Sequence, residues 1–384
     1  RRALVATIVA GLTLSLLTPA NGVVSRNDGD DTRGALDLRR VTATYKDGYA
    51  TFKVETHDAF RADDIEPDNG WIEIDLDTND DQRWNYYLIG YFDQRYRGVV
   101  LRRSGDLLSR GVSVSHPSAK VLLIRVRTSI FTSAGSYDFA AFGVTFARPC
   151  SDRSPCVDGV PNRFPLLRHD WTQPTVNFGP LPTYSVQDGP GLSVDFHFGA
   201  KDNQYGTGVR RWAVQTRPVG GSWTDTQTGR AIPPSVVLSG EEGAHYEIRI
   251  KATDGQDNTT VSETKHAIFP YDDANAALAY TGDWSIEANA EAYLGSRHVG
   301  QPGSTVTFDV AEADVVCFVV GPSTGDAVAD VDFGGPTYLS GMGVNTPPRT
   351  TACETPGITG PFTITITVGN GAPYVLDGIV ATTF

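Results

Sequence analysis

The chain has 384 residues and a formal net charge of −13. Nucleic acid and anionic membrane surfaces would repel so acidic a chain, so both are excluded as expected partners. Its 40 glycines, 23 prolines and single methionine exclude a helical bundle and are typical of many short strands joined by turns. At roughly 100 to 200 residues per domain, we expect two or three domains, each with its own core.

Residues 1–20 have the pattern of a Sec-type signal peptide. Arg1 and Arg2 precede an apolar or small run, Ala3 to Leu17, and Thr18-Pro19-Ala20 offers the small residues that a signal peptidase requires. The run is shorter than the roughly 20 residues that cross a membrane as a helix, and no later apolar stretch approaches that length. The sequence therefore predicts a secreted, extracellular protein without membrane insertion.

Residues 34–147 alternate between apolar and polar side chains in several short segments. Such period-2 segments, bounded by turns such as Asp47-Gly48 and Asn69-Gly70, predict half-buried antiparallel strands joined by hairpins. We expect a first β-sandwich here. The segments are residues 41–45, 50–56, 71–77, 86–92 and 121–126.

Residues 148–182 break this alternation with prolines and a cysteine loop, and we interpret them as a linker. Export would place the four cysteines in an oxidising compartment, which favours disulfides over a zinc site. Cys150 and Cys156 lie in one short loop, whereas Cys317 and Cys353 both lie near the C-terminus. Of the three possible connectivities, local pairing within each of these two pairs is favoured.

Residues 183–270 form a second series of strands. The order AKDNQYGTGVRRWAVQTR, a Gly-Ser-Trp turn and HYEIRIKATDGQDNTT resembles the fibronectin type III or immunoglobulin-like modules of secreted actinobacterial proteins. The resemblance implies a β-sandwich in which Trp212 packs between the sheets and Tyr246 stands at a corner. Both residues would then be structural.

Residues 275–384 resemble the compact jelly-roll modules, many of them carbohydrate-binding, that accompany sandwich domains in bacterial extracellular proteins. The matching features are Tyr280-x-Gly282-x-Trp284, the Asp-Phe-Gly-Gly turn at 332–335, and a last strand of alternating Thr and Ile at 362–368. We therefore expect an all-β chain: a signal peptide followed by three antiparallel β-sandwich or jelly-roll domains in tandem.

An acidic loop in the first domain is the one candidate metal site. Asp75, Asp77, Asn79 and Asp81 alternate carboxylate and amide oxygens, which is a ligand pattern that calcium accepts. The alternative is an Asx turn held by bonds between side chains and backbone. A second acidic loop, at Asp63 to Asn69, precedes it, and the acidic residues 27–31 are expected to form a disordered tail.

Aromatic residues are dense in the first domain, between Trp84 and Tyr96. On a strand, Tyr87, Ile89 and Tyr91 share one face, and Tyr86, Leu88 and Phe92 share the other. One face must be core, and the other could present rings to a ligand. Sandwich domains also bury many aromatics without any ligand.

Motifs for catalysis are sparse. Gly321-x-Ser323-x-Gly325 matches the nucleophile elbow of α/β-hydrolases, but a strand rather than the required helix is expected after it. The seven histidines are scattered singly and are interpreted as solvated or strand-surface residues.

The sequence thus favours a non-catalytic secreted or cell-surface binding protein that recognises glycan, cell wall or another protein, with calcium as its one candidate cofactor. The alternative is a secreted hydrolase with catalytic carboxylates in the N-terminal domain, because paired carboxylates are recognised by their separation in space rather than by a motif. No catalytic or ligand-binding residue is predicted by name.

Overall fold

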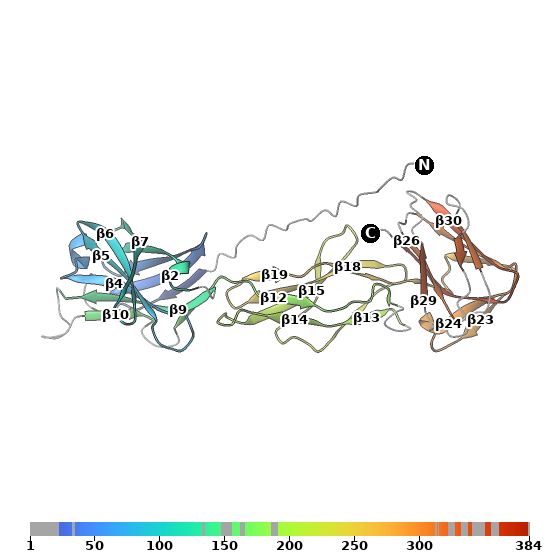
Figure 1. Cartoon of the computed structure of the whole chain (residues 1–384), viewed down its shortest axis with the longest axis horizontal. Coiled ribbons are helices and arrows are strands. Elements are labelled where there is room, and N and C mark those ends of the chain that lie inside the picture. Colours follow the sequence, from blue (N-terminus) through green and yellow to red (C-terminus); the bar gives the residue numbers. More distant parts are fainter. Residues whose placement is uncertain are drawn as a thin grey trace. The chain divides into compact units, whose positions relative to one another are not determined.

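The structure is a computed structural model, and strands make up nearly all of its regular structure, which confirms the predicted all-β fold (Figure 1). The predicted signal peptide and Cys150 lie outside the described residues. The structure describes residues 23–32, 35–132, 135–146, 156–161, 166–185, 191–311, 313, 315–321, 327–331, 337–339, 350–354 and 361–382.

The chain divides into two compact units, and each is described by itself. The first unit contains the described residues up to Pro174 together with Asp202–Gly208 and Thr253–Thr259. The second unit contains Thr175–Lys201, Val209–Ala252 and the described residues from Thr260 onward. In the described part of the chain, no helix is long and apolar enough to cross a membrane.

The first unit is built from strands with two short 3-10 turns, η1 (Ala62–Ile65) and η2 (Thr128–Ile130). Its strands are β1 (Val23–Asn27), β2 (Leu38–Lys46), β3 (Tyr49–Thr56), β4 (Gly70–Asp77), β5 (Tyr86–Asp93), β6 (Arg95–Arg102), β7 (Leu107–Ser118), β8 (Val121–Arg127), β9 (Ser136–Thr145), β10 (Cys156–Val160) and β11 (Leu167–Asp170).

These strands form two layers that share the long strand β7. The strand order is β1-β2-β3-β8-β7-β6-β5-β4-β9-β10, with β11 also paired to β9. The first half of β7 pairs with β6 and its second half with β8. Residues from both layers, such as Phe52 and Ile124 in one and Ile72 and Phe139 in the other, meet in a single core. The first unit is therefore a β-sandwich, as the alternation of its strands predicts.

Two segments of the first unit differ from the sequence-based expectation. The acidic residues 27–31 were expected to form a disordered tail, and this expectation is wrong for Asn27 and Asp28. Asn27 is the last residue of β1, which pairs in register with β2, and the Asp28 amide donates a hydrogen bond of 2.8 Å to the Arg39 carbonyl. Part of the expected linker is also regular, because β10 and β11 both pair with β9. In both cases the segment is ordered because its backbone pairs with a nearby strand, β2 or β9.

The second unit contains two further large hydrophobic cores. Its strands are β12 (Thr175–Phe178), β13 (Ser193–Phe196), β14 (Phe198–Lys201), β15 (Val209–Pro218), β16 (Thr224–Gly229), β17 (Val236–Ser239), β18 (His245–Asp254), β19 (Thr259–Val261), β20 (Lys265–Ile268), β21 (Tyr271–Asp272), β22 (Leu278–Thr281), β23 (Trp284–Ala288), β24 (Ser296–Gly300), β25 (Thr305–Val310), β26 (Val315–Val320), β27 (Ala327–Val331), β28 (Thr337–Leu339), β29 (Thr350–Glu354), β30 (Phe362–Val368) and β31 (Tyr374–Thr382), with a short 3-10 turn η4 (Tyr293–Gly295).

One of these cores contains Trp212, whose ring packs against Phe198 and whose indole donates a hydrogen bond of 2.8 Å to the Ala231 carbonyl. Tyr246 packs against the same core. The other core lies between the β23-β24-β31-β26-β29 and β22-β25-β30-β27-β28 sheets. The exact domain boundaries given by the sequence stay a prediction.

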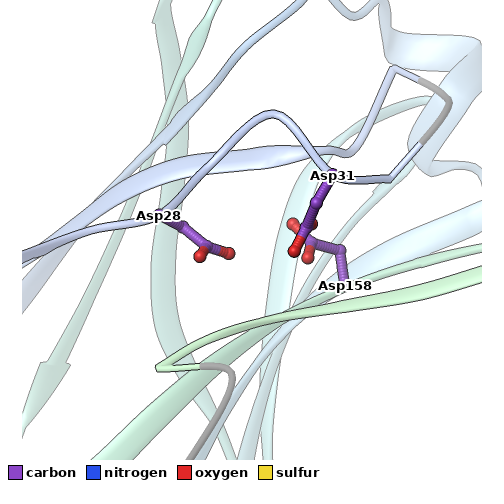
Figure 2. A group of neighbouring side chains, drawn as sticks. All are labelled: Asp28, Asp31 and Asp158. Carbon is purple, nitrogen blue, oxygen red and sulfur yellow. The ribbon is translucent and has the colours of Figure 1, made fainter.

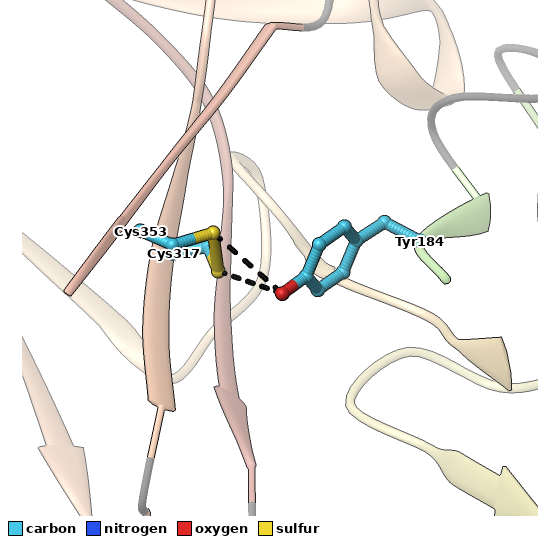
Figure 3. Close-up of a disulfide and its surroundings, with 3 residues drawn as sticks. All are labelled: Tyr184, Cys317 and Cys353. Carbon is cyan, nitrogen blue, oxygen red and sulfur yellow. Dashed lines mark hydrogen bonds between the residues drawn. A yellow bond between two sulfur atoms is a disulfide. The ribbon is translucent and has the colours of Figure 1, made fainter. Parts of the chain in front are cut away.

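A disulfide joins two neighbouring strands of the second unit, β26 and β29. Cys317 and Cys353 are register partners and are bonded to each other, as predicted. The Tyr184 hydroxyl points at this bond and lies 3.2 Å from Cys317 Sγ (Figure 3). Cys156 is also disulfide-bonded, and its predicted partner Cys150 lies outside the residues described.

Candidate functional site

One face of the β6-β5-β4-β9 layer points away from the core of the first unit. Ile72, Ile74 and Leu76 of β4 are fully buried in that core. Since side chains alternate along a strand, the residues between them point to the opposite side. We call this side the outer face. It carries Trp71, Glu73 and Asp75 on β4, Tyr87, Ile89 and Tyr91 on β5, Arg97, Val99 and Leu101 on β6, and Asp138, Ala140, Phe142 and Val144 on β9.

Strand register places aromatic rings on both sides of the β4 carboxyl groups. Glu73 lies opposite Phe142 on β9, and Asp75 lies opposite Tyr87 on β5. The rings of Trp71, Tyr87 and Phe142 are all partly exposed to solvent. The sequence left open which face of β5 is core; Tyr86, Leu88 and Phe92 pack into it, so Tyr87 and Tyr91 are on the outer face.

Glu73 and Asp75 form a carboxyl pair between these rings. The Trp71 indole donates a hydrogen bond of 2.9 Å to Glu73 Oε2. Asp75 is only 6% exposed, and its Oδ1 has no hydrogen-bond partner. Burial, followed by the hydrogen bond and charge of Glu73, raises the pKa of Asp75 to about 9. Asp75 therefore keeps its proton at neutral pH, and the pair carries one negative charge rather than two.

The hydroxyl of Tyr87 belongs to the same polar group. Burial raises the pKa of Tyr87, and the charges of Asp75 and Glu73 raise it further, whereas Arg103 lowers it. A phenol and a protonated carboxyl can donate hydrogen bonds, and the Glu73 carboxylate can accept them. Partly exposed rings beside such groups can bind a ligand that is apolar on one side and carries hydroxyl groups at its rim.

At its β6 end, the outer face borders a hollow of about 320 Å³. Tyr91 and Arg97 of the outer face line it, together with Arg95, Tyr96 and Arg110. This volume lies near the lower end of the range for small-molecule sites, which begins at about 300 Å³. The hollow therefore extends the surface over which a ligand on the outer face could make contact.

The four predicted calcium ligands, Asp75, Asp77, Asn79 and Asp81, have different hydrogen-bond partners in the structure. Asp75 belongs to the carboxyl pair. Asp77 accepts hydrogen bonds from the backbone amides of Asn79, Asp80 and Gln82 at 3.1, 3.0 and 2.8 Å, as the alternative interpretation, an Asx turn, requires. Asn79 Nδ2 donates to Asp81 Oδ2 at 3.2 Å. Calcium binding by this loop stays a prediction.

A second acidic group holds turns of the first unit together. Asp170, Asp202 and Asp254 each place a carboxylate oxygen within 4.8 Å of the others. Their oxygens accept bonds from the turns: Asp170 from the Thr172 and Thr207 amides at 3.0 Å, and Asp254 from the Asn258 amide at 2.9 Å. We interpret this group as structural.

Two other sequence expectations meet the structure here. Of the elbow-like motif, Ser323 lies outside the described residues, and strand β27 rather than a helix follows. The histidines were expected at the surface, which is wrong for His169 and His298: they are 0% and 7% exposed. His169 bonds the Tyr137 hydroxyl at 2.9 Å, and His298 pairs with Asp273. Their burial depends on packing partners distant in sequence.

Sequence reasoning missed Trp71, Glu73 and Phe142 as candidate site residues. A signal was present for two of them, because Trp71, Glu73 and Asp75 alternate with three aliphatic residues and must share a face of β4. No local signal connects Phe142 to them. Its position opposite Glu73 follows only from the pairing of β4 with β9.

No family model and no curated protein matches the chain. Solved structures that resemble it include carbohydrate-binding modules of the β-sandwich superfamily, with 13% identity, a TM-score of 0.29 and coverage of 54% of this chain and 98% of that one. Fibronectin(III)-like modules of Clostridium thermocellum CbhA match with 14% identity and a TM-score of 0.27, over 58% of this chain and 84% of theirs.

An α-L-rhamnosidase from Dictyoglumus thermophilum matches with 9% identity and a TM-score of 0.28, over 55% of this chain. The matched part is 29% of the rhamnosidase. Similarity at this level is too weak to assign a function.

Proposed function

We propose that this chain is a non-catalytic, secreted or cell-surface protein that binds glycan through the outer face of its first unit. The observation that carries the proposal is the Asp75 carboxyl group, buried between solvent-facing rings with one oxygen unpartnered. A buried polar atom without a partner costs about 1 to 3 kcal/mol. A sugar hydroxyl that donates to Oδ1 would recover that cost.

The surroundings of Asp75 favour a sugar over a purely apolar ligand. Trp71, Tyr87 and Phe142 offer flat rings for the apolar face of a pyranose, while Glu73 and Asp75 offer carboxyl oxygens on the same face of the sheet. The hydrogen bond between Trp71 and Glu73 orients a ring and a carboxylate before any ligand arrives. Such preorganisation reduces the entropy lost on binding.

The alternative, a secreted hydrolase, would need a different carboxyl pair. Glycosidases hold their two carboxyl groups about 5 Å or more apart, so that the sugar or a water molecule fits between them. Glu73 and Asp75 instead interact directly on one strand, because hydrogen bonding and charge from Glu73 both raise the pKa of Asp75. Their geometry supports recognition rather than bond cleavage.

The proposal is tested by screening the whole chain against a glycan array and measuring the best ligand by isothermal titration calorimetry. Trp71→Ala and Tyr87→Ala should each weaken binding by about tenfold or more, as expected for central aromatic contacts. Trp223→Ala is the matched control, because that partly exposed indole lies under Arg217 and Arg249 in the second unit. Its affinity should equal that of the unchanged chain.

Absence of any glycan ligand, or equal affinity for all three variants, would overturn the proposal. Release of reducing ends from the bound glycan, abolished by Glu73→Gln, would instead support the hydrolase. A thermal melt of each variant shows whether the fold has been kept.

A further inference from the structure

A group of carboxylates on the first unit lies apart from the outer face. Asp28 follows β1, Asp31 lies in the next loop, and Asp158 is in the middle of β10. One oxygen from each lies within 4.8 Å of the others. Figure 2 shows the carboxylates of Asp28 and Asp31, from the segment after β1, and that of Asp158, from β10, turned toward one another.

This spacing is that of ligands around one hard cation. Calcium binds oxygens at 2.3 to 2.6 Å, so two oxygens on the same ion lie at most about 5 Å apart. The three aspartates meet this limit although Asp158 lies 127 positions after Asp31 in the sequence. Folding therefore brings three like charges together, and their repulsion lowers the stability of the folded state. A bound cation would offset this repulsion.

Asp37 provides a second, independent observation. Its side chain is 2% exposed, and its Oδ1 has no hydrogen-bond partner. Asp158 is held beside it, because Asp158 Oδ2 accepts a bond of 2.5 Å from the amide of the next residue, Leu38. Burial and then the charge of Asp158 raise the pKa of Asp37 to about 6, while His57 lowers it. A buried acceptor, with no hydrogen-bond partner on its Oδ1, therefore lies close enough to Asp158 for the two charges to interact.

We propose that Asp28, Asp31, Asp37 and Asp158 bind one calcium ion, which fastens β1 and the loop after it to β10. All four ligands are carboxylates, and no histidine or cysteine is among them, so calcium is favoured over zinc or copper. The ion would complete its shell with water. This site differs from the loop at Asp75 to Asp81, where Asp77 is occupied by its own turn.

The test is calcium titration into the chelator-treated whole chain by isothermal titration calorimetry. Asp31→Asn is the main variant, because Asp31 is exposed and its replacement should leave the fold intact. Asp158→Asn removes the buried ligand. Each should lose one ion or bind it ~10-fold or more weakly, since affinity follows the number of charged ligands. Asp58→Asn, at an exposed position outside the group, should bind as the unchanged chain does.

Trypsin cleavage after Arg26 gives a second measurement, because Arg26 is an exposed residue of β1. Calcium should slow this cleavage in the unchanged chain and not in Asp31→Asn. Equal calcium binding by the unchanged chain and both variants, or no binding at millimolar calcium, would overturn the proposal. If only Asp81→Asn or only Asp202→Asn abolished calcium binding, the ion would be bound at another acidic loop, and the proposal would also be overturned.

Discussion

The indole Nε1 of Trp71 donates a hydrogen bond of 2.9 Å to Oε2 of Glu73, two residues further along β4. Both side chains lie on the outer face, so one bond sets the plane of a ring and the position of a carboxylate together. The Trp71 ring and the Glu73 carboxylate are therefore already oriented before a ligand binds to them. The energetic value of that order can be measured by removing the donor while the ring is kept.

Trp71→Phe keeps an aromatic ring and removes the N–H donor. We expect glycan affinity to fall by about 2- to 12-fold, which corresponds to the 0.5 to 1.5 kcal/mol cost of immobilising one side chain. Titration calorimetry measures the change, with Trp223→Phe as the control. An unchanged affinity would mean that the hydrogen bond does not preorganise the face.

Asp75 makes stability depend on pH in a defined direction. Its pKa is about 9 in the folded chain against an ordinary value of 3.8, so between these values the folded state holds a proton that the unfolded state has lost. Stability therefore falls as pH rises through this window. Asp75→Asn cannot titrate, so its unfolding free energy should fall less steeply from pH 5 to pH 8.

Urea unfolding at pH 5, 6.5 and 8 measures this difference. The gap between the two chains is at most about 1.4 kcal/mol per pH unit, because one proton is involved. Parallel pH profiles for the two chains would show that Asp75 is not held protonated.

The disulfide between Cys317 and Cys353 should stabilise the second unit. It closes a loop with a sequence separation of 36, for which the chain-entropy relation gives about 4 kcal/mol. Replacing both cysteines by serine should lower the free energy of unfolding of the second unit by about this amount, as measured by urea titration. Tyr184→Phe, which keeps the bond and removes only the nearby hydroxyl, should have a much smaller effect.

Asp170 should be the most sensitive member of its acidic group. It is 0% exposed and accepts bonds of 3.0 Å from the Thr172 amide, the Thr207 amide and Asn203 Nδ2. Asp170→Ala leaves these donors without an acceptor and should destabilise the first unit by about 1.5 to 3 kcal/mol. The exposed Glu263 serves as control, and Glu263→Ala should change stability by less than about 0.5 kcal/mol. Equal denaturation midpoints for the two variants would contradict a structural role for Asp170.

Much of the first unit could be predicted because its pattern is local. Alternation along β4 and β5 puts Trp71, Glu73 and Asp75 on one face and separates Tyr87 and Tyr91 from Leu88. The acidic turn after β4 was also predictable as an Asx turn, because Asp77 bonds amides only a few residues away.

The sequence by itself therefore determined the all-β class and the sharing of strand faces, because each depends on spacing along the chain, and it favoured the disulfide between Cys317 and Cys353 that the pairing of β26 with β29 forms. Only the tertiary structure decided which face of β5 is core and that Phe142 lies opposite Glu73. It alone brought Asp158 to Asp28 and Asp31. The physical reason is that strand pairing and core packing join residues through long-range burial, which leaves no trace in the local pattern of either partner.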